Sequence, residues 1–295
     1  MVLKLNDQGG NVELLQRRLT RAGYTVEITH VFDQATETAV MALQRDRGLV
    51  VDGQAGPKTE AALHGAKHPK HLSDTDLIQA ADALGLPVAT VRAVNQVESR
   101  GCGFLPNDDR PAILFERHVF YQRLTQRGID PAPLAAAQPN IVNQARGGYQ
   151  GGAAEYVRLA SAELIDTATA DESASWGAFQ IMGYHWDRLG YASIDEFVAC
   201  MESSEAHQLD AFVRFIKADS GLLAALKAKK WAVFAKGYNG PDYAANLYDA
   251  KLVQAYAQFS AQHVPSGDAT QPVTSEDAAQ QVPVENGQAD TESAT

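Results

Sequence analysis

Apolar side chains recur at helical spacing along most of the chain. Close to the N-terminus, three segments place apolar residues three or four positions apart, over 11–23, 36–48 and 56–65. A glycine closes each segment, and Pro57 stands at the first helical position of the third, where the missing N–H of a proline is tolerated. The pattern predicts three short helices that share one small core.

Two stretches of this first unit resemble each other. Residues 31–40 and 50–63 both place an acidic turn before a threonine, Thr36 or Thr59, and then continue with apolar residues. An internal echo of this kind is typical of a small domain built from two related pieces. We therefore expect residues 1–65 to form a three-helix bundle.

Residues 74–262 show the same helical spacing over a longer stretch. Ser73 with Asp76, and Ser193 with Glu196, resemble capping boxes that begin helices. Further helices are expected around 87–98, 116–124, 153–166, 205–218, 222–235 and 246–261, with loops at 101–111, 128–152, 167–193 and 237–243. A short hairpin is expected over 103–115, with NDDRP as its turn and AILFE as its second strand. The predicted fold class is mainly α.

Residues 66–73 have the composition of a linker between these two units. His64, His68 and His71 are spaced like metal ligands, but Pro69 breaks the helix that would align them. No nearby carboxylate or cysteine completes a ligand set, so the sequence predicts no metal site and no cofactor.

Composition limits the functional classes. The 295 residues carry a net charge of −11 and contain two cysteines, which argues against nucleic-acid binding and against a disulfide scaffold. No apolar run has the length of a membrane span. Residues 263–295 hold six acids and no aromatic, lysine or arginine residue, so we expect a disordered acidic tail. The N-terminus has no apolar signal segment, which predicts synthesis in a cytosol and release by a separate membrane-pore protein.

Glu98 is the strongest candidate for chemistry. Val91, Val94 and Val97 form one apolar face of a helix, and Glu98 lies at the rim of that face, just before a glycine-rich loop. A half-buried carboxyl group should have a raised pKa, so it can keep its proton near neutral pH and give it to a leaving group. The alternative is a glutamate that only caps the helix end.

Four segments of the larger unit place polar side chains at loop edges, where clefts form. They are VESRG with Glu98 and Ser99, PAILFERHVF with Glu116, SASWGAFQIMG with Ser175, Trp176, Gly177 and Gln180, and KGYNGPDY with Tyr238 and Asn239.

Both units resemble known families. Residues 4–64 resemble three-helix peptidoglycan-binding domains, through Gly10, Val12, Leu15, Gln16, Leu19, Gly23, Thr36, Val40, Gln44, Gly48, Leu49, Val51, Asp52, Gly53, Gly56, Thr59 and Leu63. The four segments above resemble the goose-type lysozyme and lytic transglycosylase fold, and most closely the N-acetylmuramidase domain of phage endolysins. The resemblance implies a lysozyme-like domain over 74–262 that cleaves the β-1,4 bond between N-acetylmuramic acid and N-acetylglucosamine.

The resemblance also implies roles for individual residues. Glu98 would be the general acid, and the helper carboxylate would be Asp171 or Glu172 in a loop before SASWG. Glu116 would contact the substrate, with a role as the base as its alternative. Gly177 would let backbone approach the sugar, with Ser99 and Ser175 nearby, and Gln180 would bind an N-acetyl group or a loop carbonyl. Tyr238 would hydrogen-bond Glu98, and Asn239 would support that loop. Trp176 fits a sugar subsite or the core equally well.

Two other functions remain open at this point. A lytic transglycosylase would use the same acid but form 1,6-anhydro ends. A non-catalytic wall-binding protein would keep Glu98 for structure alone. In each case the expected partner is bacterial peptidoglycan, and we expect a monomer that acts in host lysis by a phage.

Overall fold

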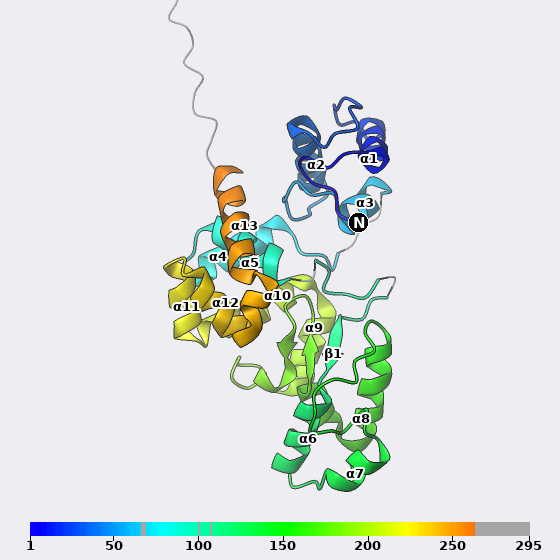
Figure 1. Ribbon diagram of the computed structural model, residues 1–295, viewed down its shortest axis with the longest axis vertical. Helices are drawn as coiled ribbons and strands as arrows, with labels where there is room; N and C mark the ends of the chain where they lie inside the picture. Colours follow the sequence, from blue (N-terminus) through cyan, green and yellow to red (C-terminus); the bar gives the residue numbers. More distant parts are fainter. Residues whose placement is uncertain (66–68, 100, 107, 263–295) are drawn as a thin grey trace, which may run out of the picture.

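The computed structural model describes residues 1–65, 69–99, 101–106 and 108–262. Figure 1 shows three short helices at one end, a helical part in the middle and a lobe with the sheet and α6 to α8 at the other end. The predicted tail at 263–295 and residues 66–68 of the expected linker, with His68 among them, lie outside the described residues.

The first domain contains the three predicted helices, α1 (Gly10–Arg21), α2 (Gln34–Asp46) and α3 (Pro57–Leu63). Its core gathers the apolar stripes of α1 and α2, with Leu15, Val40 and Leu43 fully buried. The prediction of a three-helix bundle is confirmed for this part of the chain.

Two buried glutamines explain the internal echo of this domain. Gln16 donates to Thr36 Oγ1 at 3.0 Å and accepts from the backbone N–H groups of Thr29 and His30. Gln44 makes the equivalent contacts, because it donates to Thr59 Oγ1 and accepts from two backbone N–H groups. In each half, a glutamine on a helix thus satisfies the polar groups of the loop before the next helix.

The second domain is mostly helical. Its helices are α4 (Asp74–Leu84), α5 (Val88–Glu98), α6 (Arg117–Gln126), α7 (Ala132–Ala137), α8 (Ala154–Glu172), α9 (Ile194–Ser203), α10 (Glu205–Lys217), α11 (Ser220–Lys227), α12 (Trp231–Asn239) and α13 (Tyr248–Gln262). Two short 3-10 helices, at Gly183–His185 and Pro241–Asn246, complete it. α7 lies inside a stretch that was predicted to be a loop.

Helix α5 is held in place by its neighbours α4 and α13. Ser73 and Asp76 form the predicted capping box that begins α4. Ala93 on one side of α5 packs against Ala255 and Phe259 of α13, while Val91 and Val94 enter the main core on the other side. This packing fixes the end of α5, where Glu98 lies.

The predicted hairpin forms in part, and the sheet lies beyond it. Phe104 and Pro111 form a single bridge, flanked by backbone hydrogen bonds from Leu105 to Arg110 and from Ala112 to Gly103. The strand β1 (Ile113–Phe115) pairs with β2 (Ala174–Trp176), which pairs with β3 (Ile181–Met182). All the pairs are antiparallel, and the strand order is β1-β2-β3. Local turn signals did not reveal this pairing because the partner strands are distant in sequence.

Two helices end elsewhere than predicted. α8 continues past 166 to Glu172, with a kink at Asp166, whose carboxylate accepts the N–H of Thr169 and so restarts the helix. The predicted helix over 222–235 is two helices, because Lys229 adopts a left-handed conformation (φ 53°) between them. Glycine usually occupies such a position, so a lysine there does not indicate a helix end in the sequence.

The two domains contact each other directly. The ammonium of Lys58 on α3 lies 2.6 and 2.9 Å from the two carboxylate oxygens of Glu205, the first residue of α10. Val50 of the first domain packs against the core of the second. A cavity of about 500 Å³ lies beside this junction and is lined by residues of both domains.

Among the described helices, none alone is long and apolar enough to span a membrane, whereas α4 and α5, which are bent by 115°, pass that test together on length and composition.

Candidate active site

The carboxyl group of Glu98 lies half-buried at the last residue of α5. Burial raises its pKa to about 7, against a smaller lowering by the Asn239 hydrogen bond and the charge of Lys251. Ser99 caps the helix, and its hydroxyl accepts the N–H of Gly101 at 3.4 Å. A carboxyl group with this pKa holds its proton for a large fraction of the time near neutral pH, as a general acid requires.

Asn239, at the last position of α12, holds this carboxyl group. Its side-chain nitrogen donates to both Glu98 oxygens, at 3.0 and 3.1 Å. The prediction that Tyr238 would make this bond was wrong, because the Tyr238 hydroxyl donates to the carbonyl oxygen of Phe179 at 2.9 Å. Successive helical residues point in different directions, so only one of this pair can reach Glu98.

The turn after β2 is built by the side chains that the sequence singled out. Gln180 donates to the carbonyl oxygens of Gly177 (2.9 Å) and Ala112 (3.1 Å) and accepts the hydroxyl of Ser175 at 3.0 Å. Of the two roles expected for Gln180, the structure therefore shows the bond to loop carbonyls. Trp176 is buried and donates to the carbonyl oxygen of Asp171, which favours its role in the core over a sugar subsite.

Gln208 on α10 binds the turn after β2, and the sequence did not predict this role. It is fully buried, accepts the N–H of Ala178 at 2.8 Å, and donates to the carbonyl oxygen of Gly103 at 3.3 Å. A Cβ at Gly177 would stand 2.5 Å from Gln208, and Gly177 also has φ 72°. Gly177 is thus required by packing and conformation. The available signal was a pair of polar residues, Glu205 and Gln208, within the apolar stripe of this helix.

Asp171 and Glu172 do not lie in a loop, because they form the last turn of α8. Burial alone would raise the pKa of Glu172, but hydrogen bonds from Trp186 and Arg123 and the charges of Arg123 and Arg127 lower it overall. Both oxygens of Glu172 are therefore occupied by donors. This pairing argues against a role for Glu172 as a water-activating base.

Asp171 has different surroundings. Burial, together with the negative charges of Glu163, Asp195 and Glu202, raises its pKa to about 7. These acids come from α8 and α9, so Asp171 belongs to the packing of those two helices. None of the hydrogen bonds of the described residues connects Asp171 to the Glu98–Asn239 pair, so its position rather than its pKa argues against a role as the base.

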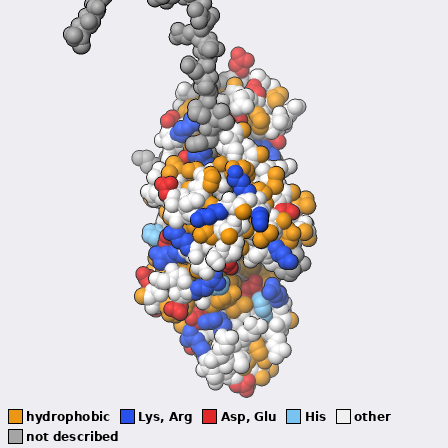
Figure 2. All heavy atoms as spheres, turned by 90° about the vertical axis from the view of Figure 1, so that its left-hand side faces the viewer, with side chains coloured by type: hydrophobic (Ala, Val, Ile, Leu, Met, Phe, Trp, Pro, Cys, Tyr) orange, Lys and Arg blue, Asp and Glu red, His pale blue; other side chains and the backbone are white. Residues whose placement is uncertain are grey.

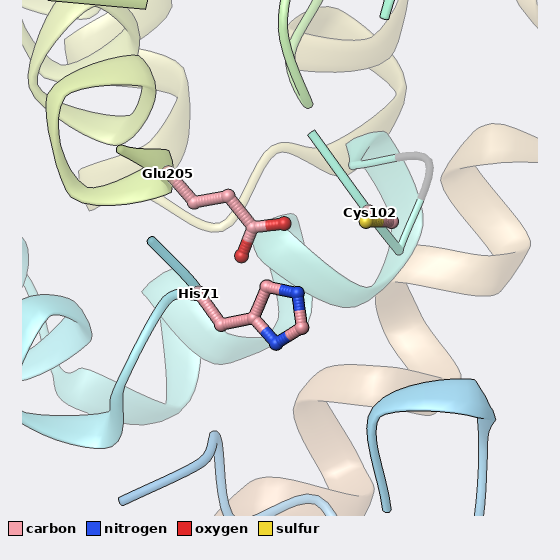
Figure 3. A group of neighbouring side chains, drawn as sticks. All are labelled: His71, Cys102 and Glu205. Carbon is pink, nitrogen blue, oxygen red and sulfur yellow. The ribbon is translucent and has the colours of Figure 1, made fainter. Parts of the chain in front are cut away.

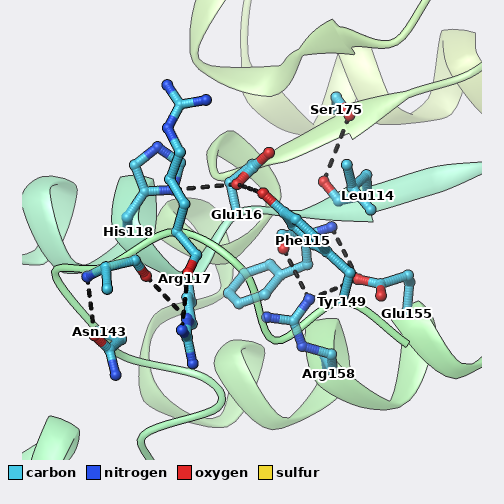
Figure 4. Close-up of polar contacts among 12 residues, drawn as sticks. Leu114, Phe115, Glu116, Arg117, His118, Asn143, Tyr149, Glu155, Arg158 and Ser175 are labelled. Atoms are coloured by element: carbon cyan, nitrogen blue, oxygen red, sulfur yellow. Dashed lines mark hydrogen bonds and ion pairs between the residues drawn. The ribbon is translucent and has the colours of Figure 1, made fainter. Parts of the chain in front are cut away.

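Glu116 directly follows β1 and remains open to a substrate role. Its carboxylate accepts the hydroxyl of Tyr149 at 2.8 Å, and the same oxygen lies 3.1 Å from Nδ1 of His118, an ion pair only when that ring is protonated (Figure 4). Burial lowers the pKa of His118, although the Glu116 charge opposes this. Glu116 therefore keeps free acceptor capacity that Glu172 lacks.

A buried ion pair positions Glu116. Arg158 and Glu155 of α8, with N–O distance 2.7 Å, bind the C=O and N–H of Phe115, the last residue of β1 (Figure 4). At the other end of β1, Gln180 donates to the carbonyl oxygen of Ala112. Tyr238 of α12 donates to the carbonyl oxygen of Phe179, in the same turn as Gln180. A continuous set of hydrogen bonds thus connects the Glu98 side of the domain to the Glu116 side.

One face of the molecule is hollowed. Figure 2 shows a hollow between the middle of the molecule and its lower lobe, with acidic side chains inside it and basic and histidine side chains at its edge. Ligands bind preferentially in concave parts of a surface, so this hollow is a candidate for the substrate cleft.

Two family models match separate parts of the chain. The N-acetylmuramidase family matches residues 87–260, which is more than half of the chain, and a peptidoglycan binding domain family matches residues 8–63. The crystal structure of a Burkholderia AP3 phage endolysin is similar, with TM-score 0.85 and 54% identity, over 88% of this chain and 100% of that one.

A curated relative is similar over a shorter stretch. It is the N-acetylmuramoyl-L-alanine amidase CwlL of Bacillus licheniformis, 40% identical over 78 residues, which are 25% of this chain. The chain spans 22% of the length of that amidase.

The family match and the similarity to the endolysin define a glycoside hydrolase of the lysozyme-like class that acts on peptidoglycan. The chain belongs to the N-acetylmuramidase family and carries an N-terminal peptidoglycan-binding domain.

Asn239→Ala is expected to move the pH dependence of activity upward. Loss of the Asn239 donor removes hydrogen bonds that favour ionised Glu98, so the pKa of Glu98 should rise above its value of about 7. Because the acid must be protonated to act, activity falls as pH rises through this pKa. The falling limb of kcat/KM against pH, measured on purified peptidoglycan, should therefore shift to higher pH. Tyr238→Phe should leave the limb in place, and the reverse result would restore Tyr238 as the partner of Glu98.

Proposed function

We propose that this protein hydrolyses the β-1,4 bond between N-acetylmuramic acid and N-acetylglucosamine, with Glu98 as the general acid. The observation that carries the proposal is the half-buried Glu98 carboxyl group with a pKa of about 7, held by Asn239 at the end of a rigidly packed helix. Protonation of the bridging oxygen by this group would let the sugar leave through an oxocarbenium-like transition state.

The second carboxylate of the proposed mechanism is Glu116. It follows the edge strand β1, and Tyr149 and His118 hold its carboxylate on one side only. Asp171 and Glu172, which the sequence favoured, are committed to packing between α8 and its neighbours. Glu116 could activate a water on the face of the sugar opposite the acid, where inverting enzymes place their base.

Alanine at each of these three positions tests this assignment. Glu116→Ala is expected to lower kcat by about 10²–10⁴-fold, the range typical of acid–base groups. Asp171→Ala should retain most of the activity of the folded fraction. If Glu116→Ala keeps its activity and the product ends become 1,6-anhydro, the substrate hydroxyl attacks and the enzyme is a lytic transglycosylase.

The first domain is proposed to bring the enzyme to its insoluble substrate. Residues 1–65 expressed alone should sediment with purified peptidoglycan. Because tethering raises the local enzyme concentration, removal of these residues should slow hydrolysis of whole wall about tenfold or more.

Soluble glycan fragments provide the control for this truncation, because they gain nothing from a tether. Removal of Lys58 also leaves the buried Glu205 without its ammonium partner, so a fall in activity on fragments would measure damage to the fold. Equal losses on wall and fragments would contradict the targeting role.

In biological terms, the proposal is an endolysin. The similarity to a phage endolysin, which covers 88% of this chain and 100% of the endolysin, supports this role. We propose that the protein acts as a monomer on the host cell wall from inside, after a separate membrane-pore protein releases it from the cytoplasm.

A further inference from the structure

Three side chains with metal-binding donor atoms meet at the junction of the two domains. They are His71 before α4, Cys102 in the loop after α5, and Glu205 at the start of α10. One imidazole nitrogen, the thiol sulfur and one carboxylate oxygen lie within 4.8 Å of one another. Figure 3 shows the three side chains converging from separate segments of the chain. No ligand set around His71 was predicted from the sequence, because Cys102 and Glu205 are far from His71 along the chain.

The donor set suits a particular class of metal ion. Zn²⁺ prefers cysteine sulfur, histidine nitrogen and carboxylate oxygen in tetrahedral geometry, with bonds of about 2.0–2.3 Å. Tetrahedral bonds of this length separate two ligand atoms by about 3.5 Å. A small side-chain rotation would bring the three donors to that spacing. We propose that His71, Cys102 and Glu205 form a binding site for one Zn²⁺-like transition-metal ion.

The position of Lys58 shows that the site already attracts a cation. Its ammonium contacts both oxygens of Glu205, which also accept the backbone N–H groups of Leu72 (2.6 Å) and Gly103 (2.8 Å). These two backbone donors hold the carboxylate in place whichever cation is bound. A metal ion must therefore displace the ammonium, and the backbone bonds can remain.

The surroundings permit this exchange. The Lys58 side chain is 24% exposed and, like all three ligands, lines the cavity of about 500 Å³ at the junction. The ammonium can turn into that cavity as the ion enters by the same route. The Cys102 thiol loses its proton to solvent, and the thiolate and the Glu205 carboxylate together balance the 2+ charge. Since the proton is released, binding should tighten as pH rises.

The exchange would also change how the domains are held together. Lys58 belongs to the first domain, whereas all three ligands lie outside its helices. A bound ion would thus replace an ion pair between domains with a link between the start of α4, the loop after Glu98 and α10. Metal binding at this site would therefore weaken a contact between the two domains, in addition to linking three segments of the second.

Titration of the full-length protein with Co²⁺ tests the proposal, because Co²⁺ replaces Zn²⁺ and reports its ligands by absorption. We expect one equivalent to bind, with a thiolate-to-metal band in the near ultraviolet and visible bands of tetrahedral intensity that Zn²⁺ abolishes. Cys102→Ser should remove the thiolate band, and His71→Ala should weaken binding at least about tenfold. Neither change breaks the Lys58–Glu205 pair. Cys200→Ser and His64→Ala are the matched controls and should bind as the wild type does.

Lys58→Met tests the exchange itself. It removes the competing ammonium and leaves the ligands, so the affinity for Co²⁺ should rise by about tenfold or more. Unchanged affinity would mean that Glu205 is not a ligand. Absence of stoichiometric binding to the wild type, or a thiolate band that persists in Cys102→Ser, would overturn the site and leave the cluster as a polar contact around one ion pair.

Discussion

Glu98→Gln is expected to lower peptidoglycan hydrolysis by about 10²–10⁴-fold, the factor that a general acid typically supplies. Glutamine keeps the shape of the side chain and can still bond Asn239, but it has no proton to give at any pH in the working range. Turbidity loss of purified peptidoglycan measures the effect. Glu202→Gln, at an exposed acid near the end of α9, is the charge-matched control and should be fully active.

The same variant should be as stable as the wild type, and more stable in alkaline solution. Because the pKa of Glu98 is raised from 4.5 to about 7 in the folded state, its protonation favours folding most fully below pH 4.5. That contribution is lost as pH rises through about 7, since burial then opposes the ionised carboxylate. Thermal melts at pH 8 should therefore show a Tm for Glu98→Gln equal to or above that of the wild type. An inactive variant with a much lower Tm would mean that Glu98 is structural.

Arg158→Ala is expected to destabilise the protein by about 3–5 kcal/mol, the cost of leaving a buried charge without its partner. Glu155 is fully buried, and Arg158 is its ionic partner at 2.7 Å. Arg158 also donates to the carbonyl oxygens of Phe115 and Asn140, which would lose their partners in the variant. Urea unfolding, followed by circular dichroism, measures the loss.

Arg127→Ala is the control for this prediction. Arg127 contacts Glu172, but it is 38% exposed, and Arg123 would still neutralise that acid. An exposed pair of this kind contributes about 0–1 kcal/mol. Similar losses for the two variants would show that burial does not govern the strength of these ion pairs, and that β1 does not depend on Arg158.

Repeating apolar positions were sufficient to predict most helices, because burial of one face determines where a helix forms. They also placed Glu98 at a buried helix end. They failed where a single residue overrides the pattern, as at Lys229, whose left-handed conformation divides α11 from α12. The kink at Asp166 has the same origin, since one carboxylate caps a new turn within an otherwise continuous helix.

The candidate site was harder to predict than the fold. Asn239 rather than Tyr238 holds Glu98, and this depends on the rotation of α12 about its axis, which a two-residue motif does not define. Glu172 resembled a loop acid because its partners, Arg123 of α6 and Arg127 just after that helix, are distant in sequence. The role of Gln208 was not predictable either, because Gln208 binds the two loops only when the fold brings Gly103 and Ala178 next to it.

Mass spectrometry of digested peptidoglycan is the most direct test of the central claim, since the chemistry at the new chain ends records the reaction. Wild-type protein should release fragments that end in reducing N-acetylmuramic acid, and Glu98→Gln should release almost none. Fragments with 1,6-anhydro ends, reducing N-acetylglucosamine ends, or equal yields from the two proteins would contradict hydrolysis by Glu98 at the N-acetylmuramic acid bond.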